Sequence, residues 1–397
     1  MKKNILFIMS NLWCGGAEKA LISLLENIDY EKYKVDLFLF KHEGMFLKSL
    51  PKEVNLLPEE PNYKYFDMSI KNALPILLRN RQIKIAIARI LYFIVERIEK
   101  NKNILSQRVW KYVSTSFKKL DKEYDLAIGF LEKNPIFFCV DKVYANKKVG
   151  WIHNDYEKLG IHYKIDCKYF DKLDRVFTVS DECLNILKRR FPQYNDKFRV
   201  MHNIIPERTI KRLSTEIVED IKFNNKCINI VSIGRLTYQK GFDIAIDACK
   251  ILVDKKYKIQ WIIIGDGEER KLLQHKLEEN NLTNNFILIG LRDNPYKYVA
   301  NSDIYVQPSR FEGKSIAIDE AKILAKPIVT TNFSTVVDQI ENNKNGIIVE
   351  KTAESIAEGI EKIIIDNNLK NNLIGNLIKE ENRSANEINV FYDVLEK

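Results

Sequence analysis

Short apolar runs alternate with amphipathic stretches along most of the chain. In the first half the apolar runs predict strands at 4–9, 35–40, 54–57, 124–130, 148–153 and 175–179. In the second half they predict strands at 228–233, 260–264, 286–290, 303–307, 328–331 and 345–349. The run at 228–233 is almost continuously apolar, which is typical of a parallel strand buried on both faces. Because the strand–helix alternation restarts midway, the pattern predicts two α/β units with parallel sheets.

The region 68–122 breaks this alternation with a long helical pattern. An apolar stripe repeats at helical spacing and consists of Ile83, Ile87, Ile90, Leu91, Ile94 and Ile98. From Lys71 to Lys122 there are thirteen Lys or Arg against three Asp or Glu, an excess as large as the +9 of the whole chain. Basic residues beside an apolar face favour an interfacial helix on anionic lipid. A helix pair packed on the sheet with a solvated basic rim is the alternative. Nucleic-acid binding by this region is a weaker alternative, since no recognised binding motif accompanies the charge.

Composition describes a globular protein of 397 residues, with 45% apolar and 29% charged side chains. This length is typical of two domains, each with its own core. The six cysteines are scattered without a C-x-x-C pair, which argues against a zinc site or a disulfide framework and favours a reducing cytoplasm. The longest apolar run, near 85–95, falls short of the roughly 20 residues that a membrane span needs. We therefore expect a cytoplasmic protein without a membrane-spanning segment.

The stretch 308–321 carries the most informative polar residues. It reads as the loop and helix that follow a strand, with Gly313 in the loop and Ser315 available as helix N-cap. Glu312 precedes the first turn, and Glu320 lies eight residues later. A helix that begins at a glycine loop presents N–H groups to anions, and carboxylates accept hydroxyl hydrogen bonds. The pattern suits a ligand that is part phosphate and part polyol, although two solvated glutamates would give the same spacing.

Other candidate residues follow predicted strands. Gly234 and Arg235 come directly after 228–233, with Lys240 a few residues later, and two cations in such a loop suit a diphosphate. His153 ends its strand where ligands bind in α/β sheets, although a structural role is the alternative. Neither Gly15-Gly16 nor the turn at 265–267 completes a G-x-G-x-x-G fingerprint, which disfavours a nicotinamide dehydrogenase.

These motifs resemble a known family. The stretch 308–327 is similar to the Glu-x7-Glu signature of the retaining, two-Rossmann-domain (GT-B) glycosyltransferases of family 4, also called group 1. Residues 15–19 resemble its Gly-Gly-Ala-Glu-Arg loop, with Lys19 in place of Arg. The segments 150–155 and 203–206 resemble its donor-contacting His segment and its interdomain linker. The resemblance is strongest over 228–349.

The resemblance implies a fold and its boundaries. The α/β chain would form two Rossmann-like domains with a cleft between them. Residues 1–203 would be the acceptor domain, including the basic helical region 68–122, and 204–380 the nucleotide-sugar domain. Residues 381–397 would form a C-terminal helix that returns to the N-terminal domain.

The resemblance also implies a reaction and roles. A hexose or N-acetylhexosamine would pass from a nucleotide-diphospho sugar, with a UDP-sugar favoured, to a saccharide acceptor with retained stereochemistry and without a metal ion or cofactor. Arg235 and Lys240 would hold the diphosphate, Glu320 the ribose, Glu312 the sugar and its developing charge, and His153 the sugar region. The expected catalytic residues are Glu312, His153, Arg235 and Lys240. The expected donor-binding residues are Gly15, Gly16, Gly234, Arg235, Lys240, Gly313, Lys314, Ser315 and Glu320.

The expected partners are the nucleotide-sugar donor, a lipid-linked saccharide acceptor and an anionic membrane surface, with no nucleic acid. Such an enzyme of capsule, exopolysaccharide or O-antigen synthesis would be peripheral on the inner face of the membrane. Lys314 departs from the aromatic or aliphatic residue that is frequent in the family, so the sugar pocket would differ. A nucleotide-sugar 2-epimerase of the same architecture and a non-catalytic sugar-nucleotide-binding scaffold subunit remain alternatives.

Overall fold

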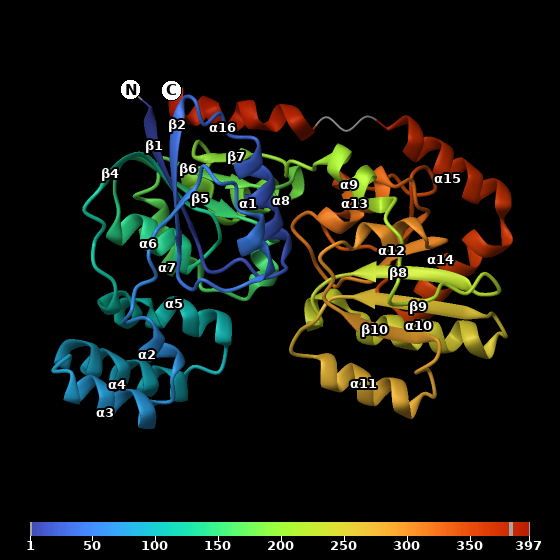
Figure 1. The fold of residues 1–397 in the computed structure, drawn as a ribbon, viewed down its shortest axis with the longest axis horizontal. Coiled ribbons are helices and arrows are strands. Elements are labelled where there is room, and N and C mark those ends of the chain that lie inside the picture. The colour runs from blue at the N-terminus through green and yellow to red at the C-terminus, as the bar shows by residue number, and fades with distance from the viewer. Residues whose placement is uncertain (1, 381–383, 397) are drawn as a thin grey trace.

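The computed structural model describes residues 2–380 and 384–396, which form two α/β domains side by side (Figure 1). Each domain is built on one sheet whose strands all pair in parallel. Parallel pairing needs a crossover after nearly every strand, and helices supply it on both faces. The predicted fold class, two Rossmann-like domains, is confirmed.

The N-terminal sheet has the order β3-β2-β1-β4-β5-β6-β7. Its strands are β1 (Lys3–Met9), β2 (Tyr33–Leu39), β3 (Asn55–Leu56), β4 (Glu123–Gly129), β5 (Tyr144–Ile152), β6 (Arg175–Thr178) and β7 (Phe198–Val200). The central strand β1 is almost wholly buried, because helices cover both faces of the sheet. Its two neighbours, β2 and β4, pair with it in continuous register.

The C-terminal sheet has the order β10-β9-β8-β11-β12-β13. Its strands are β8 (Ile228–Ile233), β9 (Ile259–Ile264), β10 (Phe286–Gly290), β11 (Ile304–Gln307), β12 (Ile328–Thr331) and β13 (Ile347–Val349). In both sheets the strand order reverses beside the first strand of the domain. Ligands bind at the carboxyl ends of strands near such a reversal.

The α-helices connect and cover these strands. In the N-terminal domain they are α1 (Gly16–Glu26), α2 (Lys64–Asp67), α3 (Ile70–Arg79), α4 (Ile83–Ile98), α5 (Lys102–Val113), α6 (Asn134–Lys142), α7 (Tyr163–Phe170) and α8 (Asp181–Arg190). The second half of the chain contains α9 (Glu207–Ser214), α10 (Phe242–Asp254), α11 (Arg270–Glu279), α12 (Tyr296–Ala300), α13 (Ile316–Ile323), α14 (Ala353–Ile365), α15 (Asn367–Lys379) and α16 (Glu387–Glu396). The domain boundary predicted at 203/204 falls between β7 and α9.

The last helix, α16, lies on the N-terminal domain (Figure 1). The ring of Phe391 stacks on Phe7 of β1 with centroids 5.8 Å apart, and Tyr392 stacks on Tyr33 at 5.2 Å. The predicted return of the C-terminal helix is therefore confirmed for α16. Residues 381–383 and Lys397 of the predicted segment lie outside the described residues.

The basic region 68–122 folds as the helices α3, α4 and α5, which form an outer layer of the N-terminal domain (Figure 1). The six predicted stripe residues of α4, called the α4 stripe below, are between 38% and 72% exposed. The opposite side of α4 packs on the core through Ile85, Ala86 and Ala88. Arg89 also lies on this buried side and donates hydrogen bonds to the carbonyls of Tyr65 and Met68. Arg89 therefore does not belong to the basic rim that the charge pattern predicts.

The α4 stripe thus faces away from the protein core, while the opposite side of α4 packs on the N-terminal domain, as a helix packed on that domain requires. Among the described residues, none of the helices combines the length and apolarity needed to cross a bilayer.

Candidate active site

A cavity of about 720 Å³ lies between the two domains. Its wall comes from loops at the carboxyl ends of the strands, where parallel sheets bind ligands. All of the predicted site residues line it: Gly15, Gly16, His153, Gly234, Arg235, Lys240, Glu312, Gly313, Lys314, Ser315 and Glu320. Residues separated by more than three hundred positions in the sequence, such as Gly15 and Glu320, are therefore brought to one place.

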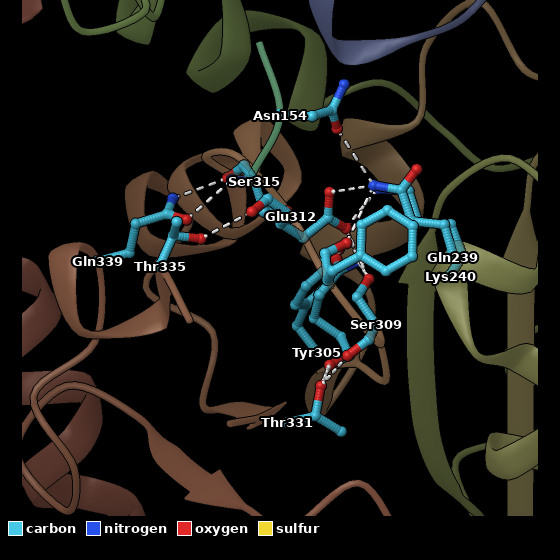
Figure 2. Close-up of polar contacts among 12 residues, drawn as sticks. Asn154, Gln239, Lys240, Tyr305, Ser309, Glu312, Ser315, Thr331, Thr335 and Gln339 are labelled. Carbon is cyan, nitrogen blue, oxygen red and sulfur yellow. Dashed lines mark hydrogen bonds and ion pairs between the residues drawn. The ribbon is translucent and has the colours of Figure 1, made fainter. Parts of the chain in front are cut away.

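Glu312 is the centre of a buried polar network (Figure 2). Its Oε1 atom accepts hydrogen bonds from Lys240 Nζ at 2.6 Å, Ser309 Oγ at 2.6 Å and Gln307 Nε2 at 3.3 Å. Its Oε2 atom accepts from Gln239 Nε2 at 3.3 Å. These partners compensate the cost of burying a carboxylate and fix its orientation. Lys240, expected to hold a diphosphate, forms an ion pair with Glu312.

The loop that carries Glu312 presses against the other domain at Gly313. A Cβ atom built on Gly313 would lie 1.9 Å from the carbonyl oxygen of His153, so only glycine fits this contact. The carbonyl of Gly313 accepts a hydrogen bond from Ser180 Oγ of the N-terminal domain at 3.2 Å. The signature loop is therefore part of the interface that closes the cavity.

The region around Ser315 differs from the sequence prediction. Ser315 occupies the N-cap position of α13, but its hydroxyl makes no capping bond and is buried without a partner among the described residues. Gln339 satisfies the backbone instead, because its side chain bonds both the N–H of Ser315 at 2.9 Å and its carbonyl at 2.8 Å (Figure 2). The Ser315 N–H, expected to face a ligand, therefore already donates its hydrogen bond to Gln339.

Glu320 lies on α13 and is only 2% exposed. Its Oε1 atom forms an ion pair with Nζ of Lys19, from α1 of the N-terminal domain, and accepts a hydrogen bond from the Tyr296 hydroxyl at 3.2 Å. The Lys19 ammonium also lies 4.7 Å from the centroid of the Tyr296 ring. Burial alone would lower the pKa of Lys19, but the Glu320 carboxylate raises it above its ordinary value. Lys19 therefore stays protonated.

Arg235 is exposed to the cavity, and its guanidinium has no hydrogen-bond or ion-pair partner within the described part of the chain. Across the cavity, the carboxylate of Glu18 lies over Gly15, where a Cβ atom would be 2.1 Å from Glu18 Oε2. Burial raises the pKa of Glu18, and the charge of Arg235 opposes this shift. A cation without such a partner on the wall of a cleft is a ready site for an anion.

His153 is buried, and its Nε2 atom has no partner among the described residues. Burial lowers its pKa to about 4, against the opposing influence of Glu132. Its imidazole is therefore neutral at pH 7 and can exchange hydrogen bonds with a hydroxyl group. Glu132 holds this segment, because its carboxylate accepts from the His153 N–H at 3.2 Å and from Asn154 Nδ2 at 2.8 Å.

Lys314 reaches the interdomain linker, where its Nζ lies 3.1 Å from Nδ1 of His202. Several cavity residues were not predicted from the sequence, among them Tyr296, Glu132 and Gln239. Lys19 stands in the Gly-Gly loop motif, and that position was the available signal for it. Among the described residues, no group of three or more His, Cys, Asp or Glu side chains could hold a metal ion.

The family comparison concerns the second half of the chain. Residues 214–380 match the family model "Glycosyl transferases group 1". A capsular polysaccharide biosynthesis glycosyltransferase, CapM of Staphylococcus aureus, is 30% identical over 200 residues, which cover 49% of this chain and 49% of CapM. An uncharacterized glycosyltransferase of Methanocaldococcus jannaschii is 31% identical over 49% of this chain and 50% of its own length. The chain thus spans about half the length of these two relatives.

A third relative is similar over more of the chain. The N-acetylgalactosamine-N,N'-diacetylbacillosaminyl-diphospho-undecaprenol 4-alpha-N-acetylgalactosaminyltransferase of Campylobacter jejuni is 24% identical over 76% of this chain and 85% of its own.

Solved structures share the fold over the full length. HepE of Anabaena, in complex with UDP and glucose, superposes with a TM-score of 0.68 at 16% identity and covers 99% of each chain. TarM of Staphylococcus aureus, in complex with UDP and other ligands, has a TM-score of 0.65 at 14% identity and covers both chains fully. These likenesses confirm the GT-B architecture.

Proposed function

We propose that the protein transfers a hexose or N-acetylhexosamine from a nucleotide-diphospho sugar, favouring UDP, to a saccharide acceptor, because residues 214–380 match the group 1 glycosyl transferase model. The observation that carries the proposal is Arg235, which has no hydrogen-bond or ion-pair partner among the described residues, in a cavity that also holds the Glu312–Lys240 pair and Glu320. A diphosphate, a sugar and a ribose each find a partner of suitable chemistry there.

In this proposal Arg235 binds the diphosphate with its planar fork, and Lys240 adds a second charge from its place beside Glu312. Together they stabilise the negative charge that develops on the leaving diphosphate, so that no metal ion is required for that task. Glu312 accepts hydroxyls of the sugar and stabilises positive charge at its anomeric carbon. Neutral His153 offers Nε2 to a sugar hydroxyl.

We propose retention as the stereochemical outcome. The acceptor hydroxyl attacks the face from which the diphosphate departs, and a phosphate oxygen takes its proton. The cations that hold the diphosphate keep that oxygen beside the anomeric carbon, which places acceptor, base and leaving group together. Closure of the domains would limit the access of water to the reaction, and the contact of Gly313 with His153 supports a close approach of the two domains.

We propose a lipid-linked saccharide as the acceptor and capsule or related polysaccharide assembly as the role. The relative from Campylobacter jejuni is named for a diphospho-undecaprenol-linked saccharide, and CapM for capsular polysaccharide. The α4 stripe supports this choice. It presents a continuous apolar face, and the exposed Lys84 and Arg97 lie on either side of it, as on helices that rest in an anionic lipid surface.

The donor site is tested by thermal shift with UDP, GDP, ADP and NAD on the wild type and on Arg235→Ala. We expect UDP to stabilise the wild type and to stabilise the variant much less, because charge-assisted hydrogen bonds to the diphosphate are lost. A response to NAD alone would refute the proposal. Incubation with a UDP-sugar in the absence of acceptor then tests for an epimerase, which would accumulate a 2-epimer. Incubation with acceptors tests for a scaffold, which would show no turnover.

The membrane surface is tested by co-sedimentation with vesicles of phosphatidylcholine, with and without phosphatidylglycerol. We expect binding only to the anionic vesicles and weakening with salt. Ile87→Asn combined with Ile94→Asn should lower binding about tenfold or more, since burial of each side chain is worth roughly 1.5–3 kcal/mol. Ile378→Asn on α15 is the control, because Ile378 is 70% exposed and so more exposed than Ile87 (53%) and Ile94 (47%). Equal binding by all variants would exclude the α4 stripe as the lipid contact.

A further inference from the structure

The ion pair between Lys19 and Glu320 links the two domains inside the cavity. Lys19 lies on α1, directly after the Gly15-Gly16 loop, and Glu320 lies in the middle of α13. Tyr296, at the start of α12, contacts both of them. This Lys19 cluster joins the N-terminal loop to Glu320, the residue that the family resemblance assigns to the ribose of the donor.

The cluster also controls how the Glu320 carboxylate is oriented. Both of its partners, the Lys19 ammonium and the Tyr296 hydroxyl, bind the Oε1 atom. With one oxygen fixed by two donors, the rotation of the carboxylate is set. The other oxygen then keeps its lone pairs for a ligand, since a carboxylate has about four acceptor positions.

Removal of Lys19 would change Glu320 in two ways. The carboxylate is almost completely buried, so the loss of the ammonium would leave a buried charge without its counter-ion. It would also lose the donor that fixes its rotation, leaving Tyr296 as the remaining contact on Oε1. Both changes weaken Glu320 as a hydrogen-bond acceptor of defined direction.

We propose that Lys19 is a positioning residue for the nucleotide-sugar donor: from the N-terminal domain it orients Glu320 of the C-terminal domain toward the hydroxyls of the ribose. The ribose site is then complete only when the Gly-Gly loop lies against α13. This inference rests on the proposed function. It adds that donor recognition, although it lies mainly on the C-terminal domain, depends on a residue of the acceptor domain.

A purely structural tether is the competing role for Lys19, and the choice of ligand separates the two. If Lys19 acts through the ribose hydroxyls, its loss will matter for a nucleotide that has them and not for one that lacks them. A tether would affect both nucleotides equally. The structure offers a matched interdomain contact outside the cavity, where Ser334 Oγ donates to Asp155 Oδ2 at 2.6 Å.

The test is calorimetric titration with UDP and with 2′,3′-dideoxy-UDP, on the wild type, Lys19→Met, Lys19→Arg and Ser334→Ala. Should GDP or ADP give the larger thermal shift, that nucleotide and its dideoxy analogue take their place. The wild type should prefer the hydroxylated nucleotide by about tenfold or more, the usual effect of hydrogen bonds to a charged group.

We expect Lys19→Met to lose most of this preference while its affinity for the dideoxy nucleotide changes little. Lys19→Arg should retain much of the preference, and Ser334→Ala all of it. If Lys19→Met does not fold, Tyr296→Phe removes the other donor to Oε1 and should reduce the preference to a smaller extent.

The failures are distinguishable. Equal weakening of both nucleotides by Lys19→Met, or an unchanged preference, would overturn the positioning role and leave the proposed function standing. A wild type that binds none of the nucleotides would overturn the proposed function and the positioning role with it.

Discussion

Replacing Lys240 by Met would test whether the Glu312 network stabilises the fold as well as the reaction. In the folded protein the side chain of Glu312 is 7% exposed and that of Lys240 16%. Met keeps the length of the lysine side chain but removes the charge. The carboxylate would then stay buried with hydrogen bonds from Ser309 and Gln239 but without a counter-ion.

The size of the effect follows from these contacts. Loss of one partner of a buried ion pair costs about 3–5 kcal/mol, and the remaining hydrogen bonds place Lys240→Met near the lower end, about 3 kcal/mol. For a domain of roughly 150–250 residues this corresponds to a decrease in Tm of about 6–12 °C. Glu312→Gln in the same chain removes the buried charge, so the double variant should recover about 2 kcal/mol of the loss.

Scanning calorimetry of the wild type, both single variants and the double variant measures these differences. Lys250→Met is the matched control, because Lys250 pairs with Asp254 in the open on α10 and its loss should cost less than about 1 kcal/mol. If Lys240→Met cost no more than Lys250→Met, or if the double variant showed the sum of the single effects, the pair would not be the buried interaction described above. The double variant should remain inactive even where its stability is restored.

Further predictions concern the contact between the domains and the neutral histidine. Gly313→Ala should weaken the contact between the domains and reduce activity at least tenfold, because its methyl group meets the His153 carbonyl. Gly375→Ala on α15 is the control. Its Cβ atom meets nothing within 4 Å, so this change should be neutral or stabilising by up to about 1 kcal/mol. Thermal melts and initial rates compare the two. The low pKa of His153, about 4, means that the unfolded chain takes up a proton below its ordinary pKa of 6.5 while the folded protein does not. Stability should therefore fall by up to about 3 kcal/mol as pH decreases from 6.5 to 4, and this part of the loss should be absent in His153→Gln. Burial raises the pKa of Asp166 to about 6, which acts in the opposite direction in the same range, so the difference between wild type and variant is the quantity to measure. A pH dependence that is identical in both proteins would refute the buried neutral imidazole.

The strands were predictable because parallel strands buried on both faces give unbroken apolar runs. Five of the six C-terminal strands begin at the predicted residue or one position from it and end where predicted, as at 228–233 and 286–290. The length of β5 was underestimated, since the strand starts at Tyr144 rather than at residue 148. Its first residues pair with β4 but leave their side chains largely exposed, so hydrophobicity carries no signal there.

The site was predictable as a set of residues but not as a set of contacts. Sequence spacing places Glu312, Arg235 and His153 at strand ends, and the topology of parallel sheets then gathers them. The sequence cannot reveal that the Gln339 side chain hydrogen-bonds to the backbone of Ser315, because the two residues are brought together by the packing of separate loops. In α4 the sequence shows apolar residues on two sides of the helix, and only the tertiary structure decides that Ile85 faces inward and Ile87 outward.

The stacking of α16 on the N-terminal domain has a consequence for biosynthesis. Phe391 and Tyr392 complete a surface formed by Phe7 and Tyr33, yet they are synthesised after the whole C-terminal domain. At roughly 5–20 residues per second, the ribosome needs on the order of 10–40 s to produce the intervening chain. During this interval the first domain exposes an apolar face beside its central strands, and it is a natural target for a chaperone until the last helix leaves the exit tunnel.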